Sequence, residues 1–348
     1  MRIWLIRLSI AFAALVVLAL LAGASFEATS RARISKLYPE PGRLVDIGGR
    51  RIQLDCRGSG APTVVFEAGL DALGSLSWSG VHDQVALTTR ACAYSRAGVM
   101  WSDPSPGAFD AVRVAKDLHT ALSAAGEKGP YVMVGHSLGG PYLLNFTGLY
   151  PADVVGLVFV DASHPDQIAR LAAAAGKPFN DGSGAAHIGE IVADTGFLRL
   201  LLPNGPPPPH LSDDVRKVSG AWFPQSLPAV VSELNGIVAT LTEAGTRRVL
   251  GNRPLVVLTR GQKSPPESAK QLKIDPARIA AIDAEWLAMQ DDEATWSTSS
   301  RHQVVPGASH YIQLDQPPVV IAAVLEVVAK VRAGRALQAP DRASANPS

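Results

Sequence analysis

The chain has 348 residues, of which 47% are hydrophobic, and 32 Lys and Arg against 31 Asp and Glu leave a formal net charge of +1. A chain of this length and hydrophobic content can bury a large core. Its near-neutral charge provides no broad basic surface, so nucleic acid is not expected as a partner.

The N-terminus has the pattern of a targeting segment. Arg2 and Arg7 precede an apolar run at residues 8–23, and Ala22-Gly23-Ala24 offers small residues at the spacing that a signal peptidase accepts. The run is also close to the shortest length that spans a bilayer, so an uncleaved anchor competes with a cleaved signal peptide. We assign residues 1–29 to this signal peptide or anchor. Both alternatives predict an exported protein, periplasmic or extracellular, and the second adds an N-terminal membrane association.

Strands and helices are expected to alternate after the leader. Residues 30–42 form a polar, proline-containing linker, and residues 44–54 predict a hairpin that turns at Gly48 and Gly49. A helical stretch at 111–125 precedes an apolar strand at 131–134. This alternation predicts an α/β fold with a doubly wound, mostly parallel sheet.

The most informative motif is Gly135-His136-Ser137-Leu138-Gly139, which follows the apolar strand. A sharp strand-to-helix turn at a serine needs small residues two positions before and after it. Such a turn lifts the Ser137 hydroxyl above the sheet edge. It also leaves the first N–H groups of the next helix free to bind negative charge. The motif therefore predicts Ser137 as the nucleophile of an acyl transfer to water.

A candidate general base lies far downstream. His310 ends the stretch Gly307-Ala308-Ser309-His310, which follows a short apolar run at 303–305. A histidine on the loop after a late strand can reach back over the sheet edge to the serine, as covalent catalysis requires. We therefore expect His310 to take the proton of Ser137.

With these motifs, the sequence resembles the α/β-hydrolase superfamily, and within it the esterases that carry a helical cap. The resemblance covers roughly residues 44–333. It implies a hydrolase core built from residues 30–164 and 253–337, with an inserted helical cap at 165–252. Helices are expected in the cap at 188–202, 212–222 and 227–244. The polar, small-residue stretch 338–348 is expected to be a disordered tail.

The resemblance also implies an oxyanion hole. Residues 64–70 are similar to the family's third strand and oxyanion turn, although Glu67-Ala68-Gly69 stands where a His-Gly pair is usual. Residues 93–102 are similar to the fourth strand and its following loop, in which Ser95 replaces the usual Asp and Met100 a Gly. The backbone N–H groups of Leu70 and Leu138 are expected to bind the oxyanion.

The acid of the expected triad departs from the family's usual position. Most relatives place it after the seventh strand, here residues 254–261, but Gly261-Gln262-Lys263-Ser264 contains no carboxylate. The sixth strand, residues 155–160, is followed by Asp161, where haloalkane dehalogenases and other relatives place the acid. Asp161 is therefore the candidate partner of His310. The alternative is that Asp161 caps a turn. The reserve candidates are Asp166, Glu267 and Asp275.

The only two cysteines, Cys56 and Cys92, fall on segments that the resemblance assigns to the second and fourth strands. Those strands are neighbours in the fold, so a disulfide is expected in an oxidising compartment, with two separate buried thiols as the alternative. The sequence has no CxxC pair, HExxH helix or calcium-loop pattern, so no metal is expected.

Together these features predict a serine hydrolase, a carboxylesterase that acts on small-molecule esters through Ser137, His310 and Asp161 without a cofactor. Oligomeric state and acyl preference are not predicted. A proline-iminopeptidase-like aminopeptidase is the alternative enzyme, and it would need Glu190, Asp194 or Glu233 to hold a free amine. The alternative from another class is a non-catalytic binding protein of the cell envelope that retains the hydrolase fold.

Overall fold

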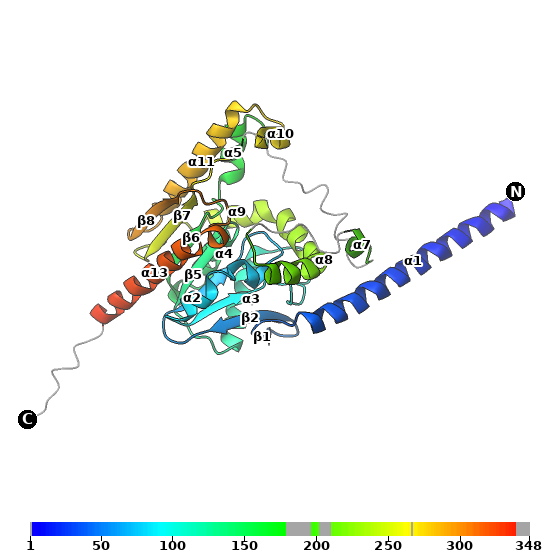
Figure 1. Cartoon of the computed structure of the whole chain (residues 1–348), viewed down its shortest axis with the longest axis horizontal. Helices are drawn as coiled ribbons and strands as arrows, with labels where there is room; N and C mark the ends of the chain where they lie inside the picture. Colours follow the sequence, from blue (N-terminus) through cyan, green and yellow to red (C-terminus); the bar gives the residue numbers. More distant parts are fainter. Residues whose placement is uncertain (1, 179–195, 202–209, 266, 339–348) are drawn as a thin grey trace, which may run out of the picture.

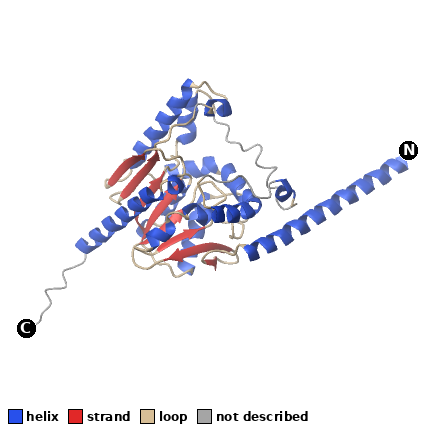
Figure 2. Cartoon of the chain, in the orientation of Figure 1, coloured by secondary structure: helices blue, strands red, loops and turns tan. Residues whose placement is uncertain are grey.

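A twisted sheet with helices on both faces forms the centre of the computed structural model, which describes residues 2–178, 196–201, 210–265 and 267–338 (Figure 1 and Figure 2). Within the described residues the sheet has eight strands in the order β1-β2-β4-β3-β5-β6-β7-β8. They are β1 (Arg43–Asp46), β2 (Arg51–Arg57), β3 (Thr63–Glu67), β4 (Ala91–Tyr94), β5 (Tyr131–His136), β6 (Val154–Val160), β7 (Leu255–Arg260) and β8 (Ser300–Val305).

The six strands from β3 to β8 run parallel, and only β2 is antiparallel to its neighbours β1 and β4. The predicted mostly parallel sheet is therefore confirmed. The expected hairpin turn at Gly48 and Gly49 is also present. Both glycines have a positive φ, and both N–H groups donate to Asp46 Oδ1 at 2.8 Å, which closes the turn between β1 and β2.

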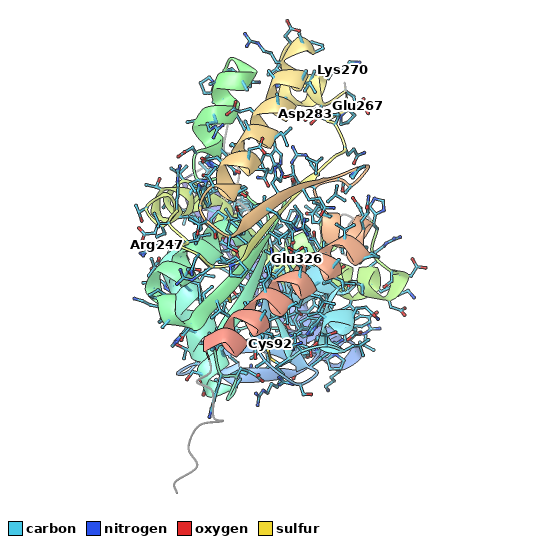
Figure 3. All side chains as sticks on the ribbon, turned by 90° about the vertical axis from the view of Figure 1, so that its left-hand side faces the viewer. Cys92, Arg247, Glu267, Lys270, Asp283 and Glu326 are labelled. Atoms are coloured by element: carbon cyan, nitrogen blue, oxygen red, sulfur yellow. A yellow bond between two sulfur atoms is a disulfide. The ribbon has the colours of Figure 1, made fainter. Side chains whose placement is uncertain are left out.

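The central strands are apolar on both sides because helices cover both faces of the sheet. In β5, Tyr131 and Met133 pack into one core cluster, whereas Val132 and Val134 pack into the other. The first cluster includes residues of α3 (Ala111–Ala124), α4 (Gly139–Leu149) and α9 (Ile237–Gly245). The second includes residues of η1 (Gly74–Trp78), α2 (His82–Ala86), α12 (Ile312–Asp315) and α13 (Pro317–Gln338). Figure 3 shows α13 lying across this second face.

The helix expected at 111–125 is present as α3, which begins at an Asp110 cap whose side chain accepts from Val112 N at 2.9 Å. The short η2 (Pro151–Asp153) leads from α4 into β6. Beyond β7, α10 (Ser268–Leu272) lies away from the sheet, and α11 (Ala277–Ala294) runs from there back to β7 and β8 (Figure 1).

The segment between β6 and β7, residues 165–252, is called the inserted segment below. Its described helices are α5 (Gln167–Ala175), α7 (Phe197–Leu201), α8 (Asp213–Asn235) and α9. They pack on different parts of the molecule: α5 on α11, α8 on α1 and α9, and α9 on α3 and α4. The helix expected at 188–202 lies mostly outside the described residues.

The expectation of a helix at 212–222 and another at 227–244 is wrong. One helix, α8, continues through Pro224 and Pro228, and α9 begins only at Ile237. A proline removes one helical hydrogen bond, so tertiary contacts must hold both halves of α8 in place. Trp222 packs against Trp101, the Ser226 hydroxyl accepts from Met100 N at 2.8 Å, and Glu233 is buried in an ion pair further along.

The N-terminal helix α1 (Arg2–Leu37) corrects the expected linker, because the chain is helical as far as residue 37. Nothing in residues 30–37 breaks a helix, and the first proline is Pro39, which fits an end at Leu37. An i, i+4 ion pair joins Arg31 and Glu27 at 2.8 Å. Helix α1 projects from the body (Figure 1), and it is long and apolar enough to cross a membrane.

The disulfide is present between Cys56 and Cys92, which face each other in the register of β2 and β4. An N-terminal apolar helix together with a disulfide fits a secreted or membrane-anchored protein.

Candidate active site

The expected elbow lies between β5 and α4. Ser137 has a φ of 52°, a left-handed conformation that a non-glycine residue rarely adopts. The glycines on either side are needed for steric reasons. A Cβ on Gly135 would lie 2.9 Å from the Gly139 carbonyl carbon, and a Cβ on Gly139 would lie 2.7 Å from the Glu67 carbonyl oxygen. The small residues that mark this motif therefore allow the strand, the turn and the loop that begins at Glu67 to approach closely.

The turn at residues 68–70 lies directly against the elbow. A Cβ on Gly69 would be 2.9 Å from the Ser137 Cβ, so only glycine fits there. The side chains of Leu70 and Leu138 belong to one apolar cluster. Neither of their N–H groups donates to a protein acceptor within the part of the chain that the structure describes. Two free backbone donors on the two loops beside Ser137 are what an oxyanion hole requires.

A buried arginine supports this turn, a role that the sequence analysis did not assign. Arg96 Nη1 donates to the Ala68 carbonyl and to Glu67 Oε1, both at 2.7 Å. Arg96 Nη2 donates to the Gly69 carbonyl at 2.6 Å and to Glu233 Oε2 at 2.7 Å. The guanidinium thus holds the turn by the carbonyls of both Ala68 and Gly69. Glu67 was a signal for such a group, since a carboxylate at the end of an apolar strand needs a buried partner.

Two further side chains complete the buried network around Arg96. The Tyr94 hydroxyl donates to Glu67, and the Arg96 guanidinium lies over the Tyr142 ring at 4.9 Å. Burial raises the pKa of Glu67 to about 7, against the opposing charge of Arg96. Burial also raises the pKa of the neighbouring Asp71 to about 6. Burial thus opposes the ionisation of both carboxyls beside the turn.

His310 and Asp161 are in direct contact. The Asp161 carboxylate accepts a hydrogen bond from His310 Nδ1 at 2.6 Å. Because the carboxylate can only accept, Nδ1 carries the proton and the lone pair of Nε2 is available to a serine hydroxyl. The hydrogen bonds of the described residues include none between Ser137 and His310, a contact that often tightens only with substrate present.

Asp161 is fully buried and is held by three donors besides the histidine. Oδ1 accepts from Arg260 N at 3.0 Å and from Trp286 Nε1 at 2.9 Å, and Oδ2 accepts from Arg260 Nη1 at 2.8 Å. Burial alone would raise the pKa of Asp161. The hydrogen bond and charge of His310, together with Arg260, instead lower it to about 2. Asp161 is therefore an anion at neutral pH, ready to stabilise an imidazolium.

His136, at the variable position of the elbow, fixes the loop of the base. Its Nε2 donates to the His310 carbonyl at 2.9 Å, and the two imidazole rings lie 4.7 Å apart. Burial, with the neighbouring charge of His310, lowers the pKa of His136 to about 3. A neutral His136 thus ties the loop that carries His310 to the residue before Ser137.

None of the hydrogen bonds or ion pairs of the described residues joins an alternative candidate acid to His310. Asp166 pairs with Arg248, and Asp275 accepts from Ala277 N at the start of α11. Glu267 lies near Lys270 and Asp283, at the end of the molecule formed by α10 and α11 (Figure 3).

Of the three carboxylates that could hold a substrate's free amine, the structure describes only Glu233. Glu233 is buried in the ion pair with Arg96. Glu190 and Asp194 lie outside the described residues.

A cavity of about 370 Å³ borders the Arg96–Glu233 pair, but neither Ser137 nor His310 lines it. It lies between α8, α3 and the loop after β4, with Arg31 of α1 at its edge. This volume is in the range of small-molecule sites, although the candidate nucleophile and base lie outside its lining. As for metals, Cys56 and Cys92 lie close to Glu127, but their sulfurs are bonded to each other and cannot act as thiolate ligands.

We expect Glu67 to make the folded chain less stable as the pH rises. Because its pKa is raised in the folded state, the folded chain binds this proton more tightly than the unfolded chain, and stability falls as pH rises from about 4.5 to 7. Glu67→Gln should remove that slope. Thermal unfolding at pH 5 and pH 7.5 checks this: the melting temperature of the parent should fall by a few degrees more than that of the variant. Asp214→Asn, at a well-exposed carboxylate, should leave the slope unchanged. Equal slopes in all three proteins would contradict the expectation.

Comparisons with known proteins show the family and the fold of the chain. The family model described as "Alpha/beta hydrolase family" matches residues 56–324. A thermophilic esterase from Thermogutta terrifontis superposes with a TM-score of 0.57 at 19% identity, covering 83% of this chain and 97% of that one. The epoxide hydrolase CorEH superposes with a TM-score of 0.56 at 18% identity, covering 83% and 98%. At these identities the likeness is one of fold.

Among curated proteins, the "Uncharacterized protein YqjL" of Bacillus subtilis is 25% identical over 280 residues, which cover 78% of this chain and 85% of that one. The "Probable transporter efuK" of Hormonema carpetanum is 38% identical over 128 residues, 34% of this chain. The "Uncharacterized protein YbdG" of Bacillus subtilis is 27% identical over 164 residues, 46% of this chain. The matched parts make up 18% of efuK and 50% of YbdG.

Proposed function

Because the chain belongs to the α/β-hydrolase family, we propose that it is a serine hydrolase that cleaves carboxylic esters through an acyl-enzyme intermediate. The observation that carries the proposal is the Asp161–His310 hydrogen bond of 2.6 Å, next to a strained serine turn. It supplies an oriented base where a nucleophile is presented.

The proposed reaction has two halves. Ser137 Oγ attacks the acyl carbon while His310 Nε2 takes its proton, and the N–H groups of Leu70 and Leu138 bind the negative oxygen that forms. The tetrahedral intermediate collapses, His310 returns the proton to the departing alcohol, and the acyl group stays on the serine. Water then attacks the acyl-enzyme with His310 again as base, which releases the acid and restores the hydroxyl. Asp161 stabilises the imidazolium in both halves.

The nucleophile separates this proposal from other chemistries of the fold. Epoxide hydrolases and dehalogenases of this superfamily attack with an aspartate at the elbow, whereas residue 137 is a serine. The aminopeptidase alternative loses support at Glu233, because that carboxylate is already buried against Arg96.

A substrate panel tests the proposal. The full chain, purified in mild detergent, is assayed on p-nitrophenyl esters of increasing acyl length beside prolyl and other aminoacyl amides, with Ser137→Ala as control. We expect ester turnover that is lost in Ser137→Ala and little amide turnover. A preference for prolyl amides would favour the aminopeptidase, and the absence of ester turnover in a folded protein would contradict the proposal.

A further inference from the structure

The apolar stretch of α1 ends where the inserted segment meets it. Residues 8–26 contain no charged side chain, and 19 helical residues extend about 28 Å, close to the hydrocarbon thickness of a bilayer. At the end of this stretch, α7 packs on α1. A Cβ on Gly196 would lie 2.5 Å from the Gly23 carbonyl and 3.2 Å from the Phe26 ring. Helix α7 therefore sits at the level where α1 would leave a membrane.

A buried ion pair fixes α7 at this position. Arg199 of α7 donates to both carboxylate oxygens of Glu27, at 2.7 and 2.9 Å, and both side chains are less than a tenth exposed. Arg199 also donates to the Ala221 carbonyl of α8 at 3.2 Å. Two-point binding of a carboxylate by an arginine fixes orientation as well as distance. The pair joins α1, α7 and α8 just after the apolar stretch, and it therefore fixes the direction in which α1 leaves the body.

The side chains of α7 that face away from this pair are apolar and exposed. Leu200 and Leu201 are 66% and 62% exposed. On α1, Leu20, Leu21 and Phe26 are also exposed within the turns next to Gly23. Two adjacent exposed leucines on a short helix, beside a helix of membrane-spanning length, form one apolar surface at the expected depth of the lipid interface.

Helix α8 connects this surface to the reactive groups. Near the middle of α8, Trp222 Nε1 donates to the Tyr38 carbonyl at 3.3 Å, just beyond α1. Eleven residues later, about 17 Å along the helix, Glu233 pairs with the Arg96 that holds the oxyanion turn. The anchor, the exposed leucines and the oxyanion turn are thus parts of one connected assembly.

We propose that α1 remains as a membrane anchor, that Leu200 and Leu201 of α7 lie in the interface of the same lipid bilayer, and that the hydrolase takes esters dissolved in that bilayer. The last clause rests on the proposed function. The first two do not, because they concern contacts with lipid alone.

Brominated lipids test the surface directly. The full chain is reconstituted into phosphatidylcholine liposomes as the variant Leu200→Trp. The matched control is Leu87→Trp, at a surface leucine after α2 that is 80% exposed. Bromine in the lipid chains quenches indole fluorescence on contact. Relative to the parent, the added fluorescence of Leu200→Trp should be at least halved in brominated lipid, and that of Leu87→Trp unchanged. Equal quenching of the two, or a purified chain that begins after residue 24, would overturn the proposal.

Kinetics test the substrate class separately. The pair Leu200→Ser and Leu201→Ser, combined in one variant, should slow the hydrolysis of a long-chain ester dissolved in the liposomes about tenfold, with Leu87→Ser as control. Hydrolysis of a water-soluble short-chain ester should not change. Equal losses on both esters would overturn the membrane-dissolved substrate. Quenching of Leu200→Trp without any ester hydrolysis would leave the lipid surface standing and remove the proposed function instead.

Discussion

Ser137→Ala and His310→Ala should each lower kcat by about five to six orders of magnitude, and the double variant should be little worse than either. The reason is that the serine attacks only while the histidine accepts its proton, so that losing one residue makes the other useless. Steady-state hydrolysis of the best ester measures this. Ser123→Ala, on the exposed side of α3, and His119→Ala, at a histidine paired with Asp153, are the matched controls and should retain activity.

Losses that add on a logarithmic scale would contradict a joint mechanism for Ser137 and His310. Each variant also needs an unchanged unfolding midpoint, because His310 contributes a ring contact with His136 as well as its proposed chemistry.

Asp161→Asn should lower kcat by about three to four orders of magnitude with the fold intact. The amide nitrogen can donate to His310 Nδ1, which would move the imidazole proton to Nε2 and block acceptance from the serine. The variant also loses the anion that His310 and Arg260 hold at a pKa of about 2. Glu267→Gln and Asp275→Asn are the controls, since their parent side chains lie away from His310, and both should be nearly silent. Activity retained in Asp161→Asn at an unchanged melting temperature would place the acid elsewhere.

Local patterns predicted the parts of the site that depend on neighbours in the chain. The elbow glycines appear in one pentapeptide because the strand and the helix must approach within a few residues of each other. Asp161 and His310 could be predicted from the sequence for a different reason. Each follows a strand of the parallel part of the sheet, β6 for Asp161 and β8 for His310, and the carboxyl ends of parallel strands meet at one edge of the sheet.

The support of the oxyanion turn could not be predicted in the same way. Glu233 lies 137 residues from Arg96 in the chain, and only the packing of α8 brings them together. The continuous helix α8 was missed for a related reason. Its two prolines predict a break, and the contacts of Trp222 and Glu233 that offset the lost hydrogen bonds are tertiary.

Labelling with a fluorophosphonate is the most direct measurement of the central claim that Ser137 is an activated nucleophile. The full chain in mild detergent is treated with the reagent and digested, and the modified peptide is identified by mass spectrometry. The account predicts one adduct, on Ser137, that is absent from Ser137→Ala and forms far more slowly in His310→Ala. A folded chain that takes no label would contradict the claim and would be the result expected of a non-catalytic binding protein. A label on another residue would also contradict it.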